Sequence, residues 1–312
     1  MFPSKDTRKL LSLMQRKIFN LKSFSDCALS LYLTLFAALV LLSGCASIKR
    51  EKVEFINPYT ILSVETTDPD AAELKGVALR LKKQDAPVAY NDIVQVYTQI
   101  SEGTAIPVNV KKSRKVIFKS SKSPETFQIV TETNTTKSNL REGIEEVEVD
   151  SRGQIIKFIK GEFTTKHGEM TFLSHKRSPI FPEKKVKVGD KWSYEEQLEM
   201  KFDSSLISRK SEKPDDIKVN CVLTGFALVQ GRRCAVIKSR TVTKRVEHYS
   251  TLWKEMKFNV NIYVYETLYF DYQRGILAGS ITKTDSYSTS EKLDFSDMSR
   301  SQSISVIEKK DE

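Results

Sequence analysis

The sequence predicts an all-β fold, mainly antiparallel, in which a large curved sheet, a half-barrel or a barrel-like sheet is accompanied by few helices. The main observation is the alternation of apolar and polar residues in two segments, 192–203 and 258–272. A period of two sustained over such lengths is typical of long strands with one buried face. One-sided burial favours antiparallel pairing, and long strands twist and curl.

Aromatic residues stand out on the apolar faces of these two strands. Trp192 and Tyr194 begin the first apolar face, and Phe258 and Phe270 belong to the second. Large aromatic side chains supply most of the apolar contact area in cores and binding sites. We therefore expect these four residues to face a hydrophobic ligand inside the curved sheet.

Polar and aromatic exceptions interrupt this pattern. Glu196 and Glu266 fall on the apolar faces, which indicates either a site inside the sheet or the place where each strand leaves the core. Tyr263, Tyr265 and Tyr269 fall on the polar face of the second strand. This tyrosine stripe packs against a second layer or offers an aromatic surface to a partner.

Two similar turn signals bound hairpins in the middle and near the end of the chain. Segments 149–153 and 270–275 both have Asp before the turn and Gly at its end, where a left-handed backbone costs little. The similarity predicts either a duplication of two hairpin-rich halves, 59–183 and 184–289, or two hairpins with ordinary turn chemistry.

The N-terminal region has the order of a secretory signal. A basic stretch is followed by an apolar run at 28–42 and then by small residues. A stable transmembrane helix needs about 18–20 apolar residues, and this run is shorter. Residues 1–44 are therefore predicted to be an export signal, and the alternative is a transmembrane helix.

The end of this region carries the short motif Leu42-Ser43-Gly44-Cys45. It resembles the lipobox of bacterial lipoproteins. The resemblance implies cleavage between Gly44 and Cys45 and attachment of a diacylglycerol to the Cys45 thiol. Two or more acyl chains give stable membrane attachment. In lipoproteins of two-membrane bacteria of the enteric kind, aspartate directly after the cysteine marks retention in the inner membrane. For such a bacterium, the absence of aspartate after Cys45 implies the outer membrane, facing the periplasm or the cell surface.

The predicted organisation of the chain follows from these features. After the signal peptide at 1–44, residues 45–58 form the lipid anchor and tether. Residues 59–289 form the antiparallel β domain, and residues 290–312 form a polar C-terminal tail, either without regular structure or with one last strand at 303–307.

Two cysteines, Cys221 and Cys234, remain besides the lipidated one after cleavage of the signal. An extracytoplasmic compartment permits a disulfide between them. They flank a turn signal at 230–232, and a simple hairpin centred there does not place them opposite each other. The alternatives are a disulfide, which needs a bulge or a different turn centre, and two separate buried thiols.

A second motif lies between the two halves of the domain. Residues 182–192 read P-E-K-K-V-K-V-G-D-K-W. This resembles a P-x-K-x-V-x-V-G-D-x-W phrase found in a group of bacterial secreted and lipid-anchored β proteins. The resemblance implies secretion and a β fold, and it implies no particular activity.

The sequence carries no recognisable catalytic or metal-binding pattern. His167, Glu169 and His175 lack the spacing of a metal site, and the third histidine is His248. No nucleophile elbow or phosphate-binding glycine loop is present. We therefore expect no enzyme activity, no cofactor and no metal.

Of the net charge of +10, residues 1–44 carry +4, because they hold six basic and two acidic residues, so the mature part carries +6. A charge of this size suits solubility and is compatible with mild attraction to anionic membrane or polysaccharide surfaces. No nucleic-acid-binding motif accompanies it, so a nucleic-acid partner is not expected.

Together these features predict a non-enzymatic lipoprotein of the cell envelope, attached to the membrane through its N-terminal acyl chains. Its curved sheet is expected to bind a hydrophobic ligand or an envelope protein. The alternatives are a structural or assembly subunit of an envelope complex and a hydrolase of an envelope polymer. A carrier predicts an apolar cavity, a docking subunit predicts a filled core with an exposed aromatic patch, and a hydrolase predicts converging acidic groups or a histidine.

Overall fold

The computed structural model divides the chain into two units, Met1–Gly44 and Cys45–Glu312. The residues that it describes are all in the second unit: 55–100, 106–123, 125–135, 143–165, 168–172, 179–198, 200–204, 207–211, 215–251, 255–290 and 295–308. The predicted signal, the lipobox and most of the tether therefore lie outside the described residues. None of the helices within these ranges has the length and apolarity needed to cross a membrane.

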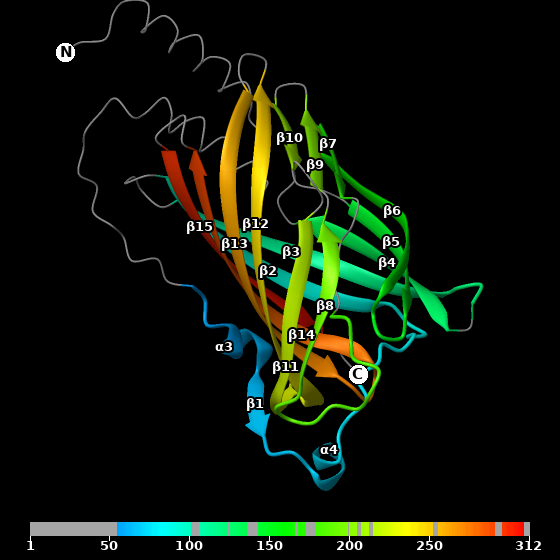
Figure 1. Cartoon of the computed structure of the whole chain (residues 1–312). Coiled ribbons are helices and arrows are strands. Elements are labelled where there is room, and N and C mark those ends of the chain that lie inside the picture. The colour runs from blue at the N-terminus through cyan, green and yellow to red at the C-terminus, as the bar shows by residue number, and fades with distance from the viewer. Residues whose placement is uncertain are drawn as a thin grey trace, which may run out of the picture. The chain divides into compact units, whose positions relative to one another are not determined.

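The described part is mostly antiparallel β structure with two short helices, as predicted (Figure 1). The elements in chain order are α3 (Pro58–Leu62), β1 (Val64–Thr67), α4 (Ala71–Leu74), β2 (Val88–Ile100), β3 (Ile106–Ser120), β4 (Thr126–Thr135), β5 (Gly143–Asp150), β6 (Ile155–Thr165), β7 (Gly168–Phe172), β8 (Lys191–Leu198), β9 (Met200–Ser204), β10 (Ile207–Ser211), β11 (Asp215–Val229), β12 (Arg232–Thr251), β13 (Glu255–Asp271), β14 (Ile276–Ser290) and β15 (Phe295–Ile307).

These strands form a single curled sheet. Its hydrogen-bonded order is β1-β11-β12-β10-β9-β7-β6-β5-β4-β3-β2-β15-β14-β13, and β8 pairs with β11. The long strand β12 also pairs with β13, which is at the other end of this order (Figure 1). The sheet therefore curls round on itself, and it has an inner and an outer face.

The two turns predicted from Asp and Gly are confirmed. The Gly153 amide donates to the Asp150 carbonyl at 3.0 Å, and the Gly275 amide donates to the Asp271 carbonyl at 2.7 Å. Both glycines have a positive φ, which favours glycine at these positions. They connect β5 to β6 and β13 to β14.

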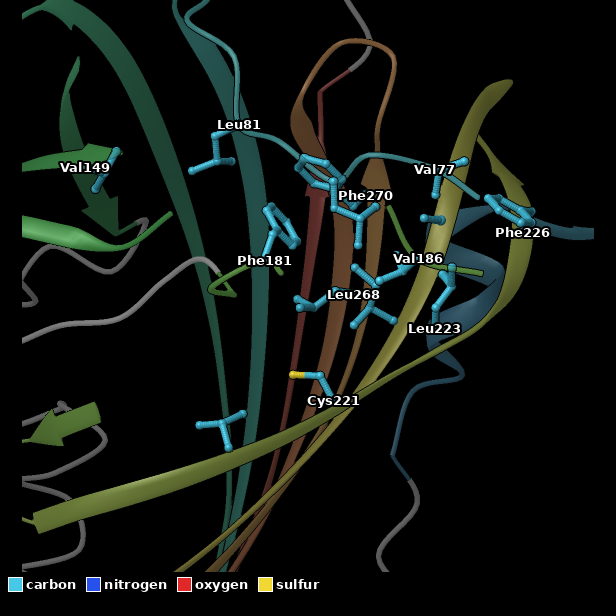
Figure 2. Close-up of a cluster of buried hydrophobic side chains, with 14 of the residues drawn as sticks. Val77, Leu81, Val149, Phe181, Val186, Cys221, Leu223, Phe226, Leu268 and Phe270 are labelled. Carbon is cyan, nitrogen blue, oxygen red and sulfur yellow. The ribbon is translucent and has the colours of Figure 1, made fainter. Parts of the chain in front are cut away.

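The apolar core fills one end of the inner face. Loop residues Phe181 and Val186 pack there against Leu223, Leu268 and Phe270 of the sheet (Figure 2). The rings of Phe181 and Phe270 have their centroids 4.4 Å apart. The loops that carry the apolar side chains thus close this end of the curled sheet, and the tight packing holds the strands of that end together.

The helix α3 packs on one face of the sheet, and we define this face as the outer face. Leu62 of α3 is buried with Tyr269 and Ile304 in a second core cluster. A Cβ atom added to Gly279 would lie 2.5 Å from Leu62 Cδ2 and 3.0 Å from the Ser305 carbonyl oxygen. Gly279 is therefore what lets α3 approach the sheet.

The helix α4 is fixed to the sheet by a buried carboxylate. Glu73 forms an ion pair with Arg233 at 2.6 Å and accepts a hydrogen bond of 2.6 Å from the Tyr272 hydroxyl. Burial opposes ionisation of Glu73, but the hydrogen bonds from Arg233 and Tyr272 outweigh it and lower its pKa to about 2. Arg233 also donates to Thr67 and to the Asp68 carbonyl.

The two cysteines are free, buried thiols, so the structure has the alternative without a disulfide. The β11–β12 pairing places Cys221 opposite Ser239 and Cys234 opposite Ala227. Cys221 belongs to the inner core cluster, whereas Cys234 belongs to the cluster under α3. The two thiols therefore point to opposite faces of the sheet, and this orientation prevents a disulfide.

Two predicted boundaries differ in the structure. Segment 192–203 was expected to be one strand, but it is divided into β8, which pairs with β11, and β9, which pairs with β7 and β10. The expected polar tail at 290–312 contains β15, which lies between β14 and β2 and begins well before the possible last strand at 303–307. Its earlier part is rich in small serines, a composition that indicates no strand, while Ile304 and Val306 near its end are buried.

Candidate functional site

The outer face of the sheet carries a row of polar side chains that the strand register sets side by side. Each residue lies directly opposite the next on β8, β11, β12, β13 and β14. The row consists of Ser193, Asn220, Arg240, Tyr265 and Lys283. Neighbouring strands lie about 4.8 Å apart, so the row spans about 20 Å.

A second, parallel row lies two residues further along the same strands. It consists of Lys191, Val222, Lys238, Thr267 and Ile281. Together with Pro58 and Tyr59 of α3, the two rows line a groove of about 700 Å³, which we call the basic groove.

Four further residues border the basic groove: Trp192, Cys221, Ser239 and Glu266. Their positions in the alternation turn their side chains to the inner face. The Glu266 carboxylate accepts hydrogen bonds there from the Ser239 and Thr282 hydroxyls, at 3.3 and 3.4 Å. The carboxylate that interrupts the apolar face of β13 is thus bound by hydroxyl groups on the inner side.

The basic groove has an uncompensated positive charge. Lys191, Lys238, Arg240 and Lys283 are all exposed. None of these four cations has a carboxylate within ion-pair distance in the part of the chain that the structure describes. Cations that are close together and unpaired attract anions, and the attraction weakens as salt is added.

Tyrosines give the groove an apolar component. The Arg240 guanidinium lies over the Tyr265 ring, 5.7 Å from its centroid, and Tyr265 is 43% exposed. Beside this row, Tyr263 and Tyr287 make an edge-to-face contact at 6.0 Å next to exposed Val242. The outer face therefore combines cations with exposed aromatic and aliphatic groups.

The tyrosine stripe of β13 divides between its two predicted roles. Tyr265 is exposed and Tyr263 is half-buried, so these two rings form a surface. Tyr269 is instead buried in the cluster under α3, and burial raises its pKa to about 12. The helix α3 covers Tyr269 and leaves Tyr265 exposed. The periodicity of β13 could not predict this difference, because it does not show where α3 packs.

The four residues expected to face a ligand do not form one site. Phe270 is 1% exposed inside the filled core, and half-buried Trp192 and Tyr194 pack against that core. The Trp192 indole nitrogen donates to the Ile180 carbonyl at 3.0 Å. Phe258 is also buried, but it lies outside the core clusters of the described residues.

The inner face beyond the core carries several buried polar groups. Arg245 and Glu247 form a buried ion pair at 2.6 Å on β12. Arg114 of β3 pairs with Asp92 at 2.9 Å and donates to the Ser305 hydroxyl at 2.7 Å. Side chains of this kind make this part of the inner wall polar, which is unlike the wall of a carrier for a wholly apolar ligand.

Two of the histidine and carboxylate candidates have described side chains: Glu266, which borders the groove with its carboxylate on the inner side, and His248 on β12, which does not line the groove. His167, His175 and the side chains of Glu169 and Glu196 lie outside what the structure describes. In the described ranges, no three His, Cys, Asp or Glu side chains are grouped as metal ligands would be.

Comparison with known proteins gives no family assignment. No protein-family model matches the sequence, and no curated protein matches it significantly. The lipid anchor and the secretion that the lipobox and the V-G-D-x-W phrase imply therefore remain predictions from the sequence.

Sequence reasoning missed the basic groove. Its cations come from positions 191, 238, 240 and 283, and only the strand register brings them together. One sequence signal pointed to part of it: Lys238 and Arg240 alternate with inward-facing residues on β12, which places both cations on one face.

Proposed function

We propose that this chain is a lipid-anchored, non-enzymatic protein of the cell envelope that binds an envelope component through the outer face of its curled sheet. The observation that carries the proposal is the basic groove with its exposed tyrosines. Unpaired cations and exposed aromatic rings are groups that bind partners, and the groove combines both on a rigid sheet.

The anchor part of the proposal is supported by the N-terminal sequence. The basic stretch, the apolar run at 28–42 and the motif Leu42-Ser43-Gly44-Cys45 together have the order of a lipoprotein signal. A short tether then connects Cys45 to Ile56, which is hydrogen-bonded to the outer face. An acyl anchor on Cys45 would keep that face close to a membrane.

The choice of the outer face is supported by the packing of the inner one. A docking protein is expected to have a filled core and an exposed aromatic patch. Phe181, Leu268 and Phe270 fill one end of the sheet, while Tyr265 and Tyr287 are exposed outside. The inner polar groups beyond the core add nothing that favours an apolar ligand.

The test is site-specific photo-crosslinking in the source cells. A photoreactive phenylalanine analogue replaces Tyr265 in one variant, and it replaces Ile156, exposed on β6, in the matched control. We expect an adduct with an envelope component, either protein or lipid, from position 265 and a much weaker one from position 156. Equal yields from the two positions, or no adduct from position 265, would contradict the proposal.

A second candidate function is a carrier of a hydrophobic ligand, which is favoured by the curling of the sheet around an inner face that extends beyond the filled core. If the inner face holds a ligand, protein purified from its native cells should release one lipid per chain on solvent extraction. Mass spectrometry that finds no stoichiometric lipid would exclude this function.

A further inference from the structure

We propose that the component bound by the basic groove is the anionic headgroup surface of the membrane that holds the acyl anchor. The sheet would then lie with its outer face on the lipid instead of projecting freely from it. The inference rests on the proposed lipidation of Cys45.

The end of the tether is hydrogen-bonded to the sheet close to the basic groove. The Ile56 amide donates to the Gln95 side-chain oxygen at 2.9 Å, and the Gln302 side-chain nitrogen donates to the Ile56 carbonyl at 2.8 Å. Gln302 lies directly opposite Lys283 on the neighbouring strand. The chain that comes from the anchor therefore reaches the sheet one strand away from the cationic row.

The tether is short. Cys45 precedes Ile56 by 11 residues, and a fully extended chain spans at most about 3.6 Å per residue. Cys45 is thus held within about 40 Å of Ile56, which contacts the sheet one strand away from Lys283. A tether this short keeps the groove at a high effective concentration near the headgroups, so weak individual contacts suffice.

The side chains of the groove have the chemistry that anionic headgroups require. Lys191, Lys238, Arg240 and Lys283 are exposed and lack carboxylate partners in the described ranges, so each is available to a lipid phosphate. Each Lys or Arg near an anionic leaflet strengthens binding about fivefold. Tyrosine rings prefer the boundary between headgroups and acyl chains, which suits Tyr59 and Tyr265 at the groove.

The position of the cations also favours a lipid surface over a protein. They come from β8, β12 and β14 and spread over about 20 Å of a sheet face. A membrane offers many equivalent phosphates to such a spread, with no need for a matching shape. The tether and the cations also share one face, as required if the anchor and the docking surface act on the same membrane.

The experiment uses the mature lipidated protein, extracted in detergent and reconstituted into vesicles. One set contains phosphatidylcholine alone, and the other contains 30% phosphatidylglycerol. An amine-reactive reagent then labels exposed lysines, and mass spectrometry measures the labelling rate at each site. We expect Lys238 and Lys283 to react at least fivefold more slowly in the anionic vesicles, and this protection to disappear in 0.5 M NaCl.

Two charge-matched variants make the test specific. Lys191→Glu/Arg240→Glu reverses two cations of the groove and keeps Lys238 and Lys283 as reporters. Lys122→Glu/Lys157→Glu makes the same charge change at exposed positions on other strands and turns. We expect the first variant to lose most of the protection and the second to keep it.

Each outcome decides the inference. Equal labelling of Lys238 and Lys283 in the two kinds of vesicle overturns it and leaves a lipid-anchored protein with another partner. Equal loss of protection in both variants also overturns it, because the effect would then follow net charge alone. If the intact mass shows no acyl chain, the proposed anchor is wrong. In that case the unacylated protein is tested by vesicle flotation. Flotation with anionic vesicles only would still support headgroup binding by the basic groove, and no flotation would overturn it.

Discussion

Gln302 and Ile56 join the N-terminal segment to the sheet: the amide nitrogen of buried Gln302 donates to the Ile56 carbonyl at 2.8 Å. The pair spans almost the whole described chain, from the end of the tether to β15. Since Gln302 lies opposite Lys283, this bond sets the distance between the incoming tether and the basic groove. It links the two parts of the proposed function, the anchor and the binding face.

The variant Gln302→Ala should release the start of the described chain. The Ile56 carbonyl loses its donor, and a buried hydrogen bond of this kind is worth about 1 kcal/mol. We expect faster amide hydrogen exchange over residues 55–63, with a free energy of unfolding lowered by about 1–3 kcal/mol. In the control Gln273→Ala, at an exposed turn, exchange over this segment should not change; equal exchange in both variants would contradict the role of Gln302.

The variant Gly279→Ala should separate α3 from the sheet. The new methyl group would lie 2.5 Å from Leu62 Cδ2, so the helix has to shift. Overpacking of this kind costs about 1–3 kcal/mol, which urea unfolding can measure. Gly225→Ala is the matched control because no atom lies within 4 Å of its added Cβ. In a double-mutant cycle, Gly279→Ala should cost less in a Leu62→Ala background than in the wild type, and an equal cost would show that the contact with Leu62 is not the cause.

The Glu73–Arg233 contact should make stability depend on acid. The pKa of Glu73 is lowered to about 2, so the carboxylate contributes stability that is present above its unfolded pKa of about 4.3. This contribution, about 3 kcal/mol, is lost as the pH falls from about 5 through about 2. The free energy of unfolding of Glu73→Gln should therefore fall below that of the wild type at pH 7 and approach it near pH 2.

A control for this pH dependence is Glu65→Gln, which makes the same change at an exposed position of β1. It should alter the free energy of unfolding by less than about 0.5 kcal/mol. A constant difference between Glu73→Gln and the wild type from pH 7 to pH 2 would show that the contact does not titrate as described.

The buried thiols should be unreactive in the folded mature protein. Burial raises the pKa of Cys234 to about 12, so almost no thiolate is present at neutral pH. We expect maleimide to label Cys221 and Cys234 only after denaturation, and oxidation of the native protein to leave them unlinked. A disulfide found between them by peptide mapping would disprove the register of β11 against β12.

The curled antiparallel sheet could be predicted from the sequence, whereas the candidate site could not. Alternation in β13 and the Asp and Gly residues of two turns are local signals, and the structure confirms the strand and both hairpins. The end of β15, at 303–307, could be predicted as a possible strand, whereas its earlier, serine-rich part could not. The basic groove depends on cross-strand register, which no single segment encodes.

The aromatic residues show the same limit. Periodicity correctly placed Phe270 on a buried face, but it could not reveal that Phe181, from a distant loop, occupies the space beside that ring. The expected ligand site is therefore partly a filled core. The exposed tyrosines of the outer face belong to the candidate site only because the strand register places cations beside them.

The central claim is that Cys45 anchors this protein to a membrane, and both proposals rest on it. The most direct measurement is the intact mass of the mature protein extracted with detergent from its own cell membranes. We predict a chain that begins at Cys45 and carries a diacylglycerol, unchanged in Cys27→Ala and lost in Cys45→Ala. A chain with an unmodified Cys45, or one that keeps the residues before it, would contradict the claim.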